Sequence, residues 1–479
     1  MGATGKSKLF YLHVAITLFF MFGFGFLPPL EPITPLGMKL VGIFIGLIYA
    51  WSTTTMIWPS LLGMVAVVLS GVVDLKTLFA DGFGNNTVVF ILLVFIFAAA
   101  IEETGLTEYL ARCLMNLSWT KGHPWRLVFV ILFGSYIIAA ATSLYPVVLI
   151  FWTIIYDICK TTGYKPFDKF PTLMLIGIML CATLGSACLP FKALAMMFNG
   201  AYEALTGMTV GFLPWLSFSL SVGISGIIVY MLLMRFAFRL DLSGMEKASK
   251  ESYLAAAKIT PAQKMSLIML VAFIALAILP TLISKTLFGQ ILIKIGAPGI
   301  LICILALMIL IPVDGKPLLN FRVAASKGII WDVIIMFTVV FPLSTYLTGE
   351  GTGVKEFLNG AIGPLLTGQS PLVFTLLMLI LPTIITNFAN NTVVALIFLS
   401  VLCSLAETVG IDPTPIAVAL AFCTQYAFLT PAASAPSAVL FGNTEWLRAK
   451  DIYKYMAISI TALTILTITL TLTVGKLVF

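Results

Sequence analysis

Charged residues are scarce in this sequence. Only 10% of its 479 residues are Asp, Glu, Lys or Arg, whereas 60% are hydrophobic, and an ordinary soluble domain carries about 25% charged residues. Residues 127–156 and 357–406 contain no charged side chain, although one bilayer crossing needs only roughly 20 apolar residues. The sequence therefore excludes a soluble globular enzyme and predicts an all-α polytopic protein that crosses the cell membrane many times.

Patterns for metal binding and catalysis are also missing. The seven cysteines form no CxxC pair, so neither a disulfide framework nor a zinc site is indicated. The absence of a P-loop and of an HExxH motif argues against ATP-driven pumping and metalloprotease chemistry. Gly223–Gly226 matches a Gly-x-Ser-Gly nucleophile pattern, but His13 and His123 are not in a later span where a base is needed. We therefore expect no enzyme and no cofactor beyond a possible Na+, and the scattered Lys and Arg residues predict no nucleic-acid partner.

Eleven apolar stretches have spanning length. They cover about 9–27, 36–51, 56–73, 86–103, 172–200, 212–234, 264–284, 295–313, 328–348, 414–442 and 452–475. Two further stretches, 127–156 and 371–403, are too long for one upright helix and too short for two crossings, and polar residues interrupt each near its middle. We expect re-entrant helical hairpins there, because irregular backbone at membrane depth is tolerated only where it lines a cavity or is buried in protein.

The basic residues predict the orientation of these spans. With a cytoplasmic N-terminus and both hairpins returning to their own side, all but seven of the 27 Lys and Arg residues lie inside. The seven are Lys39, Lys76, Lys285, Lys294, Lys355 and Lys476, which lie outside, and Lys192, which lies within a span. This asymmetry follows the positive-inside rule. Counting either hairpin as one crossing would invert everything after it.

The two halves of the chain carry a repeat. Residues 103–110 reappear as 351–358, and each copy closes a span and opens a short amphipathic segment, 106–118 and 353–366. The same offset of 248 aligns Thr-Ser-Leu at 142–144 with Asn-Asn-Thr at 390–392, in the middles of the two hairpins. Five crossings and one hairpin per half make an odd number of crossings, so the halves are expected to be inverted. Inverted repeats with broken helices are typical of secondary transporters, although a duplicated scaffold without transport is an alternative.

The repeat also predicts how the chain is organised. We expect residues 1–118 and 264–366 to form two scaffold parts, each with an amphipathic arm helix, and residues 125–236 and 370–479 to form two transport parts, joined by a cytoplasmic linker over 237–263.

Polar residues gather in the middle of the second hairpin, where residues 386–392 read Thr-Asn-Phe-Ala-Asn-Asn-Thr. A helix start offers backbone N–H groups to an anion, and Asn carbonyls can coordinate a hard cation such as Na+. We predict that Asn390, Asn391 and Thr392 bind substrate. Thr386, Asn390 and Asn391 are the candidate ligands of the cation. Capping of the two helices is the alternative.

The second broken span contains Thr-Pro-Ala-Ala-Ser-Ala-Pro-Ser at 430–437. Two prolines remove backbone donors and keep the helix open, which leaves carbonyls and hydroxyls exposed toward a cavity. Ser434 and Pro436 are therefore candidate substrate contacts, and Ala433 belongs to the candidate cation site. A proline kink without a ligand role is the alternative.

These motifs resemble the divalent anion:sodium symporter family of di- and tricarboxylate transporters, over nearly the whole chain. The family's second hairpin reads Thr-x-Phe-x-Ser-Asn-Thr, which Thr386, Phe388, Asn391 and Thr392 match while Asn390 replaces the Ser. Its Thr-Pro-Pro-Asn loop is represented by residues 434–437. The resemblance implies a homodimer in the lipid membrane that carries a small organic anion, with Na+ as a possible partner, by an elevator mechanism.

The first half departs from that family. Where the family repeats Ser-Asn-Thr, this chain has Thr142, Ser143 and a leucine, which argues against the family's usual first sodium site. Thr142 and Ser143 remain candidate substrate ligands. Lys192 lies in the loop of the first broken span, opposite Ser434 at an offset of 242. Placing Lys at a helix centre costs about 2.5–3.5 kcal/mol, so we predict that Lys192 faces a cavity and attracts the anion in place of a sodium ion. Snorkelling to the interface is the alternative.

The leading hypothesis is thus secondary active transport of di- or tricarboxylates, either coupled to sodium or as anion exchange with reduced sodium dependence. The alternatives are an anion channel, which would use the same polar residues without alternating access, and a transporter of inorganic anions such as sulfate.

Overall fold

The computed structural model describes residues 8–479 except 244, 246–257, 348, 355, 358–359, 361–369, 389–390 and 432. Helices make up nearly all regular structure in these ranges, where the one strand pair is β1 (Pro312–Val313) with β2 (Lys316–Pro317). The prediction of an all-α polytopic membrane protein is confirmed. The chain forms two compact units. One contains residues up to 92, 196–209 and 330–420, and the other contains residues 93–195, 210–329 and 421–479.

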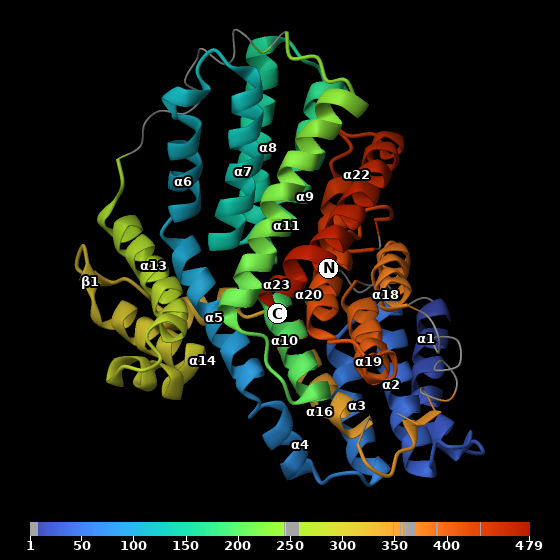
Figure 1. Ribbon diagram of the computed structural model, residues 1–479. Helices are drawn as coiled ribbons and strands as arrows, with labels where there is room; N and C mark the ends of the chain where they lie inside the picture. Colours follow the sequence, from blue (N-terminus) through green and yellow to red (C-terminus); the bar gives the residue numbers. More distant parts are fainter. Residues whose placement is uncertain are drawn as a thin grey trace. The chain divides into compact units, whose positions relative to one another are not determined.

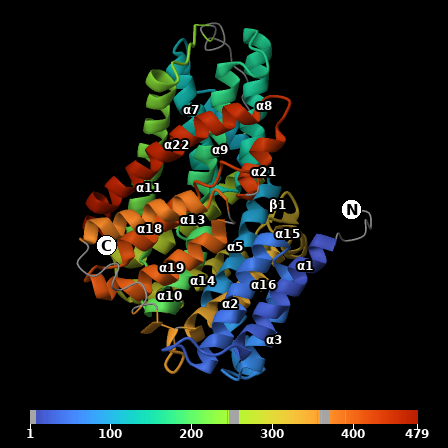
Figure 2. The ribbon, with the colours of Figure 1, turned by 90° about the vertical axis from the view of Figure 1, so that its right-hand side faces the viewer.

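The first unit is a bundle of N-terminal helices with helices from the second half of the chain. Its elements are α1 (Lys8–Leu18), the turns η1 (Phe19–Gly23) and η2 (Phe24–Phe26), α2 (Pro35–Thr53), α3 (Ile57–Ser70), α4 (Leu75–Gly82), most of α10 (Ala193–Thr206), α16 (Trp331–Leu347), α18 (Pro371–Ile385), α19 (Asn391–Val409) and most of α20 (Thr414–Cys423). Helices α2 and α3 lie beside α16 (Figure 2). Gly82 lets α4 approach α16 closely, since an added Cβ would lie 2.3 Å from the Thr338 carbonyl oxygen.

The second unit is arranged around α9 (Figure 1). Its elements are the later part of α5 (Asn86–Glu103), α6 (Leu106–Met115), η3 (Ser118–Thr120), α7 (Pro124–Ala141), α8 (Leu144–Thr162), α9 (Lys169–Ser186), α11 (Phe212–Leu232), η4 (Leu233–Ala237), α13 (Pro261–Leu282), α14 (Leu287–Leu310), α15 (Phe321–Gly328), α21 (Ala435–Gly442), α22 (Ala449–Leu470), η5 (Thr471–Gly475) and α23 (Lys476–Val478). Helix α9 packs against α7, α8, α11 and α22 and is buried from Phe170 to Gly185.

Nine helices of the described ranges are long and apolar enough to cross a membrane, or ten if α15 and α16 count as one span. They include both helices of the first hairpin. They do not include α2 and α3, which are apolar but shorter. The prediction of a multi-pass protein is therefore confirmed, whereas the number of eleven crossings stays a prediction.

Both expected hairpins are pairs of helices that pack against each other. Helices α7 and α8 lie side by side and are separated only by Thr142 and Ser143, and α18 and α19 are separated at residues 386–390 (Figures 1 and 2). The first pair extends over 124–162 and is longer than the predicted 127–156. At about 1.5 Å per residue its helices of 18 and 19 residues are each about 27 Å long. Whether re-entrant or crossing twice, such a pair returns the chain to its own side.

Each of the two expected broken spans contains a pair of helices joined by a non-helical segment. The first breaks between Ser186 and Ala193, and the second between Cys423 and Ala435. Pro436 lies in the first turn of α21, where its missing N–H costs no hydrogen bond.

The turn that opens the repeat has the same local structure in both copies. Gly105 and Gly353 both adopt left-handed backbone, with φ of 72° and 70°. Thr104 Oγ1 donates to the Ile101 carbonyl oxygen at 2.7 Å, and Thr352 Oγ1 donates to the Gly349 carbonyl oxygen at 2.9 Å, three residues back in each case. Only glycine adopts such backbone without strain. The shared conformation supports the repeat that the sequence pattern predicts.

Candidate functional site

Thr142 ends α7 and turns the chain toward α8. Its backbone is non-helical (φ −125°, ψ −131°), and its N–H and hydroxyl both bond to the Ile138 carbonyl oxygen, at 2.8 and 2.7 Å. The side chain is buried. Because its hydroxyl proton is used inside α7, Thr142 offers a ligand its backbone carbonyl rather than a hydroxyl donor.

Ser143 occupies the N-cap position of α8 with extended backbone (φ −115°, ψ 147°). A serine there commonly accepts a hydrogen bond from the first turn of its helix, but within the described structure the Ser143 side chain makes no capping bond. Its hydroxyl donates instead to Glu102 Oε2 at 3.1 Å. The first turn of α8 is therefore not capped by this side chain.

Lys192 lies at the end of the loop between α9 and α10, where its N–H donates to the Leu189 carbonyl oxygen at 3.0 Å. Its Nζ donates to the carbonyl oxygen of Thr142 in the break between α7 and α8. The side chain is half-buried. Lys192 and Thr142, which are 50 residues apart, are thus brought together, and the Lys192 side chain points into the fold. That Lys192 faces a cavity and attracts an anion stays a prediction.

Side chains from α11 hold the loop that carries Lys192. Trp215 Nε1 donates to the Ala187 carbonyl oxygen at 3.2 Å, and Ser219 Oγ donates to the Cys188 carbonyl oxygen at 2.6 Å. Tyr136 of α7 donates its hydroxyl to Cys188 Sγ at 3.1 Å. No sequence pattern marks these residues as functional, because each lies in a span whose apolar pattern is complete without it.

The second hairpin has buried polar residues at the end of α18. Thr386 and Asn387 are buried, and Asn387 Nδ2 donates to the Thr383 carbonyl oxygen at 2.7 Å. Phe388 is 74% exposed. Asn391 and Thr392 begin α19, and Asn391 Oδ1 accepts a hydrogen bond from the Thr392 N–H at 2.9 Å. Asn390 lies outside the described residues.

The second loop closes on itself through two serines. Ser434 Oγ donates to the Ala427 carbonyl oxygen at 2.7 Å and accepts from the Ser437 N–H at 3.1 Å. Ser437 Oγ donates to the Thr430 carbonyl oxygen at 2.7 Å. Ala433 is buried, and Pro436 is half-buried. Part of the polar content of this loop therefore caps α21.

The candidate residues divide between the two compact units. Thr142, Ser143, Lys192, Ala433, Ser434 and Pro436 belong to the second unit, whereas Thr386, Asn391 and Thr392 belong to the first. Asn85, by contrast, caps α5, since its Oδ1 accepts from the Thr87 N–H at 2.8 Å.

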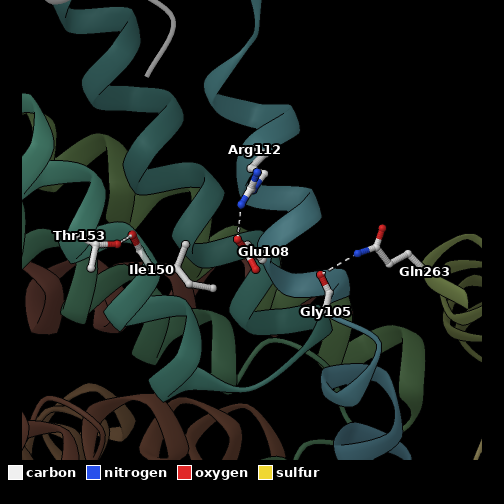
Figure 3. A network of polar contacts seen from close by, with 6 residues as sticks. All are labelled: Gly105, Glu108, Arg112, Ile150, Thr153 and Gln263. Atoms are coloured by element: carbon white, nitrogen blue, oxygen red, sulfur yellow. Dashed lines mark hydrogen bonds and ion pairs between the residues drawn. The ribbon is translucent and has the colours of Figure 1, made fainter. Parts of the chain in front are cut away.

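The first amphipathic segment is a helix, α6, beside the first hairpin. Glu108 and Arg112 form an ion pair along its surface, and Gln263 Nε2 of α13 donates to the Gly105 carbonyl oxygen at 3.3 Å, at the start of α6 (Figure 3). Helix α6 packs against α7, α8 and α13. The second segment, 353–366, lies largely outside the described residues.

A cavity of about 490 Å³ lies at the far end of the first hairpin. Its lining includes Gly163, Tyr164, Lys169, Arg239 and Asp241. Hydrogen bonds from the N–H and hydroxyl of Ser243 lower the pKa of Asp241. Helix α8, of 19 residues, separates this cavity from Ser143 by about 27 Å at 1.5 Å per residue, so the cavity is not part of the candidate site.

Interrupted membrane helices with polar groups in the breaks are typical of membrane transporters, which are not enzymes. The family model described as citrate transporter (CitMHS) matches residues 46–423. The chain belongs to this citrate transporter family and is a multi-pass membrane protein.

Curated relatives include named transporters. The chain is 24% identical, over 429 residues, to the sodium-dependent dicarboxylate transporter SdcS of Staphylococcus saprophyticus, with 84% of this chain and 80% of that protein aligned. It is 26% identical over 130 residues to the Na(+)/citrate cotransporter of Rattus norvegicus, which covers 27% of this chain and 22% of that protein. The first match extends over most of both chains, whereas the second covers about a fifth of the animal protein.

The fold is similar to that of a solved transporter. The Alcanivorax borkumensis YdaH transporter aligns with a TM-score of 0.57 over 84% of this chain and 88% of that chain, at 16% sequence identity. At this identity the likeness establishes a shared fold alone.

Proposed function

We propose that this chain is a secondary active transporter of small organic anions, most simply di- or tricarboxylates, that works by elevator-type alternating access as a homodimer. The observation that carries the proposal is Lys192, a cation held at the break of the first hairpin by the Thr142 carbonyl, in a chain of the citrate transporter family. Relatives named as dicarboxylate and citrate transporters support the substrate class.

The anion is proposed to bind where the first turn of α8 and the Lys192 ammonium are both within reach. The first turn of a helix presents N–H groups and the positive end of the helix dipole to an anion. An ammonium has three donors, and the Thr142 carbonyl accepts from one of them. For the other half, the assignment of Thr392 to substrate binding and of Thr386, Asn390, Asn391 and Ala433 to a Na+ site stays a prediction from the sequence.

The fixed charge of Lys192 is proposed to replace a first sodium ion. A tethered cation is not released in each cycle, so transport depends less on a sodium gradient, and exchange of one anion for another becomes possible. The test is uptake of labelled succinate into proteoliposomes with sodium replaced by choline. Wild type should keep part of its uptake, whereas Lys192→Ala should lose most of it.

Lys160→Ala is the matched control, since Lys160 is exposed on α8 and paired with Asp157, and it should behave as wild type. Steep, multi-ion sodium dependence in wild type together with normal uptake in Lys192→Ala would contradict the charge replacement. Counterflow, in which external unlabelled anion accelerates exit of labelled anion, separates a transporter from an anion channel. Competition by sulfate, citrate and succinate in the same assay separates carboxylates from inorganic anions.

A further inference from the structure

Glu102 is a carboxylate that neither the repeat nor the family motifs assign a role. It lies in the last turn of α5 and is half-buried, whereas its neighbour Glu103 is exposed. Glu102 Oε2 accepts the hydroxyl hydrogen bond of Ser143 at 3.1 Å. A carboxylate inside a membrane protein is costly unless it has a partner, and such residues commonly mark functional sites.

Glu102 and Lys192 contact consecutive residues of the same break. Lys192 donates to the carbonyl of Thr142, and Glu102 accepts from the hydroxyl of Ser143. The break between α7 and α8 is therefore held from two other segments of the chain by opposite charges.

This arrangement sets the charge that an anion meets at the start of α8. The positive helix end and Lys192 attract an anion, whereas Glu102 repels it. Because Lys192 and Glu102 carry opposite unit charges, the pair has no net charge. The Ser143 side chain bonds to Glu102 and does not cap α8. The Glu102 carboxylate therefore contacts the N-cap residue of α8.

We propose that Glu102 is a specificity-determining residue that favours dianions over trianions. The proposal rests on the proposed function and names a narrower substrate class for the same site. Attraction by a net positive site grows in proportion to the charge of the anion, whereas the cost of removing the anion from water grows with the square of its charge. With Glu102 ionised, a third negative charge adds desolvation cost and gains little attraction. In a site that had the Lys192 charge without the Glu102 charge, attraction to the ammonium would offset the desolvation cost of the third negative charge.

The test compares two competitors in one uptake assay. Inhibition of labelled succinate uptake by unlabelled succinate and by citrate is measured in proteoliposomes at pH 7, and the ratio of the two inhibitory concentrations is the readout. Wild type should prefer succinate. Glu102→Gln keeps the hydrogen-bond acceptor for Ser143 and removes the charge, so the ratio should shift toward citrate by about tenfold or more, as expected for one nearby charge at an effective dielectric of about 20.

Two further variants separate charge from folding. Glu103→Gln removes an adjacent exposed charge and should keep the wild-type ratio. Glu102→Asp keeps the charge and should also keep the ratio, even if affinity falls for both anions. An unchanged ratio in Glu102→Gln, or an equal shift in Glu103→Gln, would overturn the proposal. If Glu102→Gln loses all uptake while Glu102→Asp transports normally, the ratio of succinate to citrate binding is measured in Glu102→Gln instead. An unshifted binding ratio there would also overturn the proposal. Wild type that transports neither anion would instead contradict the proposed function.

Discussion

Lys192 illustrates how a single charged side chain is accommodated inside an apolar fold. The cost of placing an ammonium within a span is reduced when it is hydrogen-bonded and near an opposite charge. Here the Thr142 carbonyl accepts its hydrogen bond, and Glu102, which accepts from Ser143 in the same break, is an opposite charge in its neighbourhood. The position of Lys192 within an apolar stretch was the signal that singled it out in the sequence, and its role in attracting an anion stays a prediction.

The position of Glu102 beside this break was not predictable from the sequence. Glu102 and Glu103 are adjacent and follow an apolar run, as interfacial charges at the end of a span do. Only the turn of the helix decides which of the two faces the fold, and the bend at Gly105 begins two residues later. The same limit applies to Asn387, which is buried at 1% exposure although it stands next to the 74% exposed Phe388.

Thr392 is the residue that best tests the second hairpin. Thr392→Ala should weaken the apparent affinity for succinate by roughly 1.5–3 kcal/mol, the usual contribution of a hydrogen bond to a charged group. The measurement is the concentration dependence of uptake. Thr375→Ala on α18 is the matched control and should leave affinity unchanged, because its hydroxyl bonds to the Pro371 carbonyl within its own helix at 2.8 Å. If Thr392→Ala and Asn391→Ala both keep the wild-type affinity for succinate, these residues only cap α19.

Glycines decide how closely the helices of the second unit approach one another. A Cβ on Gly185 of α9 would lie 2.1 Å from the Tyr136 carbonyl oxygen of α7, and a Cβ on Gly223 of α11 would lie 2.3 Å from the Tyr136 hydroxyl oxygen. Small residues at such crossings allow backbone contact in membrane proteins. The Gly-x-Ser-Gly pattern at 223–226 is therefore explained by packing.

Gly185→Ala should destabilise the protein, because the contact is with backbone that cannot move aside. Overpacking of this kind typically costs about 1–3 kcal/mol, so the midpoint of thermal unfolding in detergent should fall. Gly442→Ala is the control, since an added Cβ there meets nothing within 4 Å, and its midpoint should match wild type. A Gly185→Ala protein that unfolds at the wild-type temperature would show that α7 and α9 separate at little cost.

At this scale the sequence predicted the breaks better than the helix ends. Polar or proline residues within apolar runs marked interruptions at 142–144, around Lys192 and at 430–437. The structure has breaks between Ala141 and Leu144, between Ser186 and Ala193 and between Cys423 and Ala435. The first hairpin extends past its predicted limits because Arg126 and Asp157 lie inside helices. Charged residues end an apolar stretch but do not end a helix, and Gly163 with φ of 81° ends this one.

For the whole molecule, the expected orientation can be tested with cysteine labelling. Replacing the seven native cysteines gives a background in which Ser118→Cys or Ser284→Cys is added, both at exposed positions. A membrane-impermeant maleimide applied to intact cells should label Ser284→Cys and leave Ser118→Cys unlabelled, and permeabilisation should expose Ser118→Cys. The reverse pattern would place the N-terminus outside and would mean that the distribution of basic residues does not govern this topology.

The order of helices along the chain has a consequence for synthesis. Each compact unit contains segments from both halves of the sequence, and α9 packs against α22, the last long helix. The ribosome therefore releases α9 into the membrane well before its neighbour exists, and the face meant for α22 has lipid or an insertion factor as its interim partner. A chain that stops before α22 leaves that face uncovered permanently, so the cell's quality control can recognise a truncated transporter by its incomplete centre.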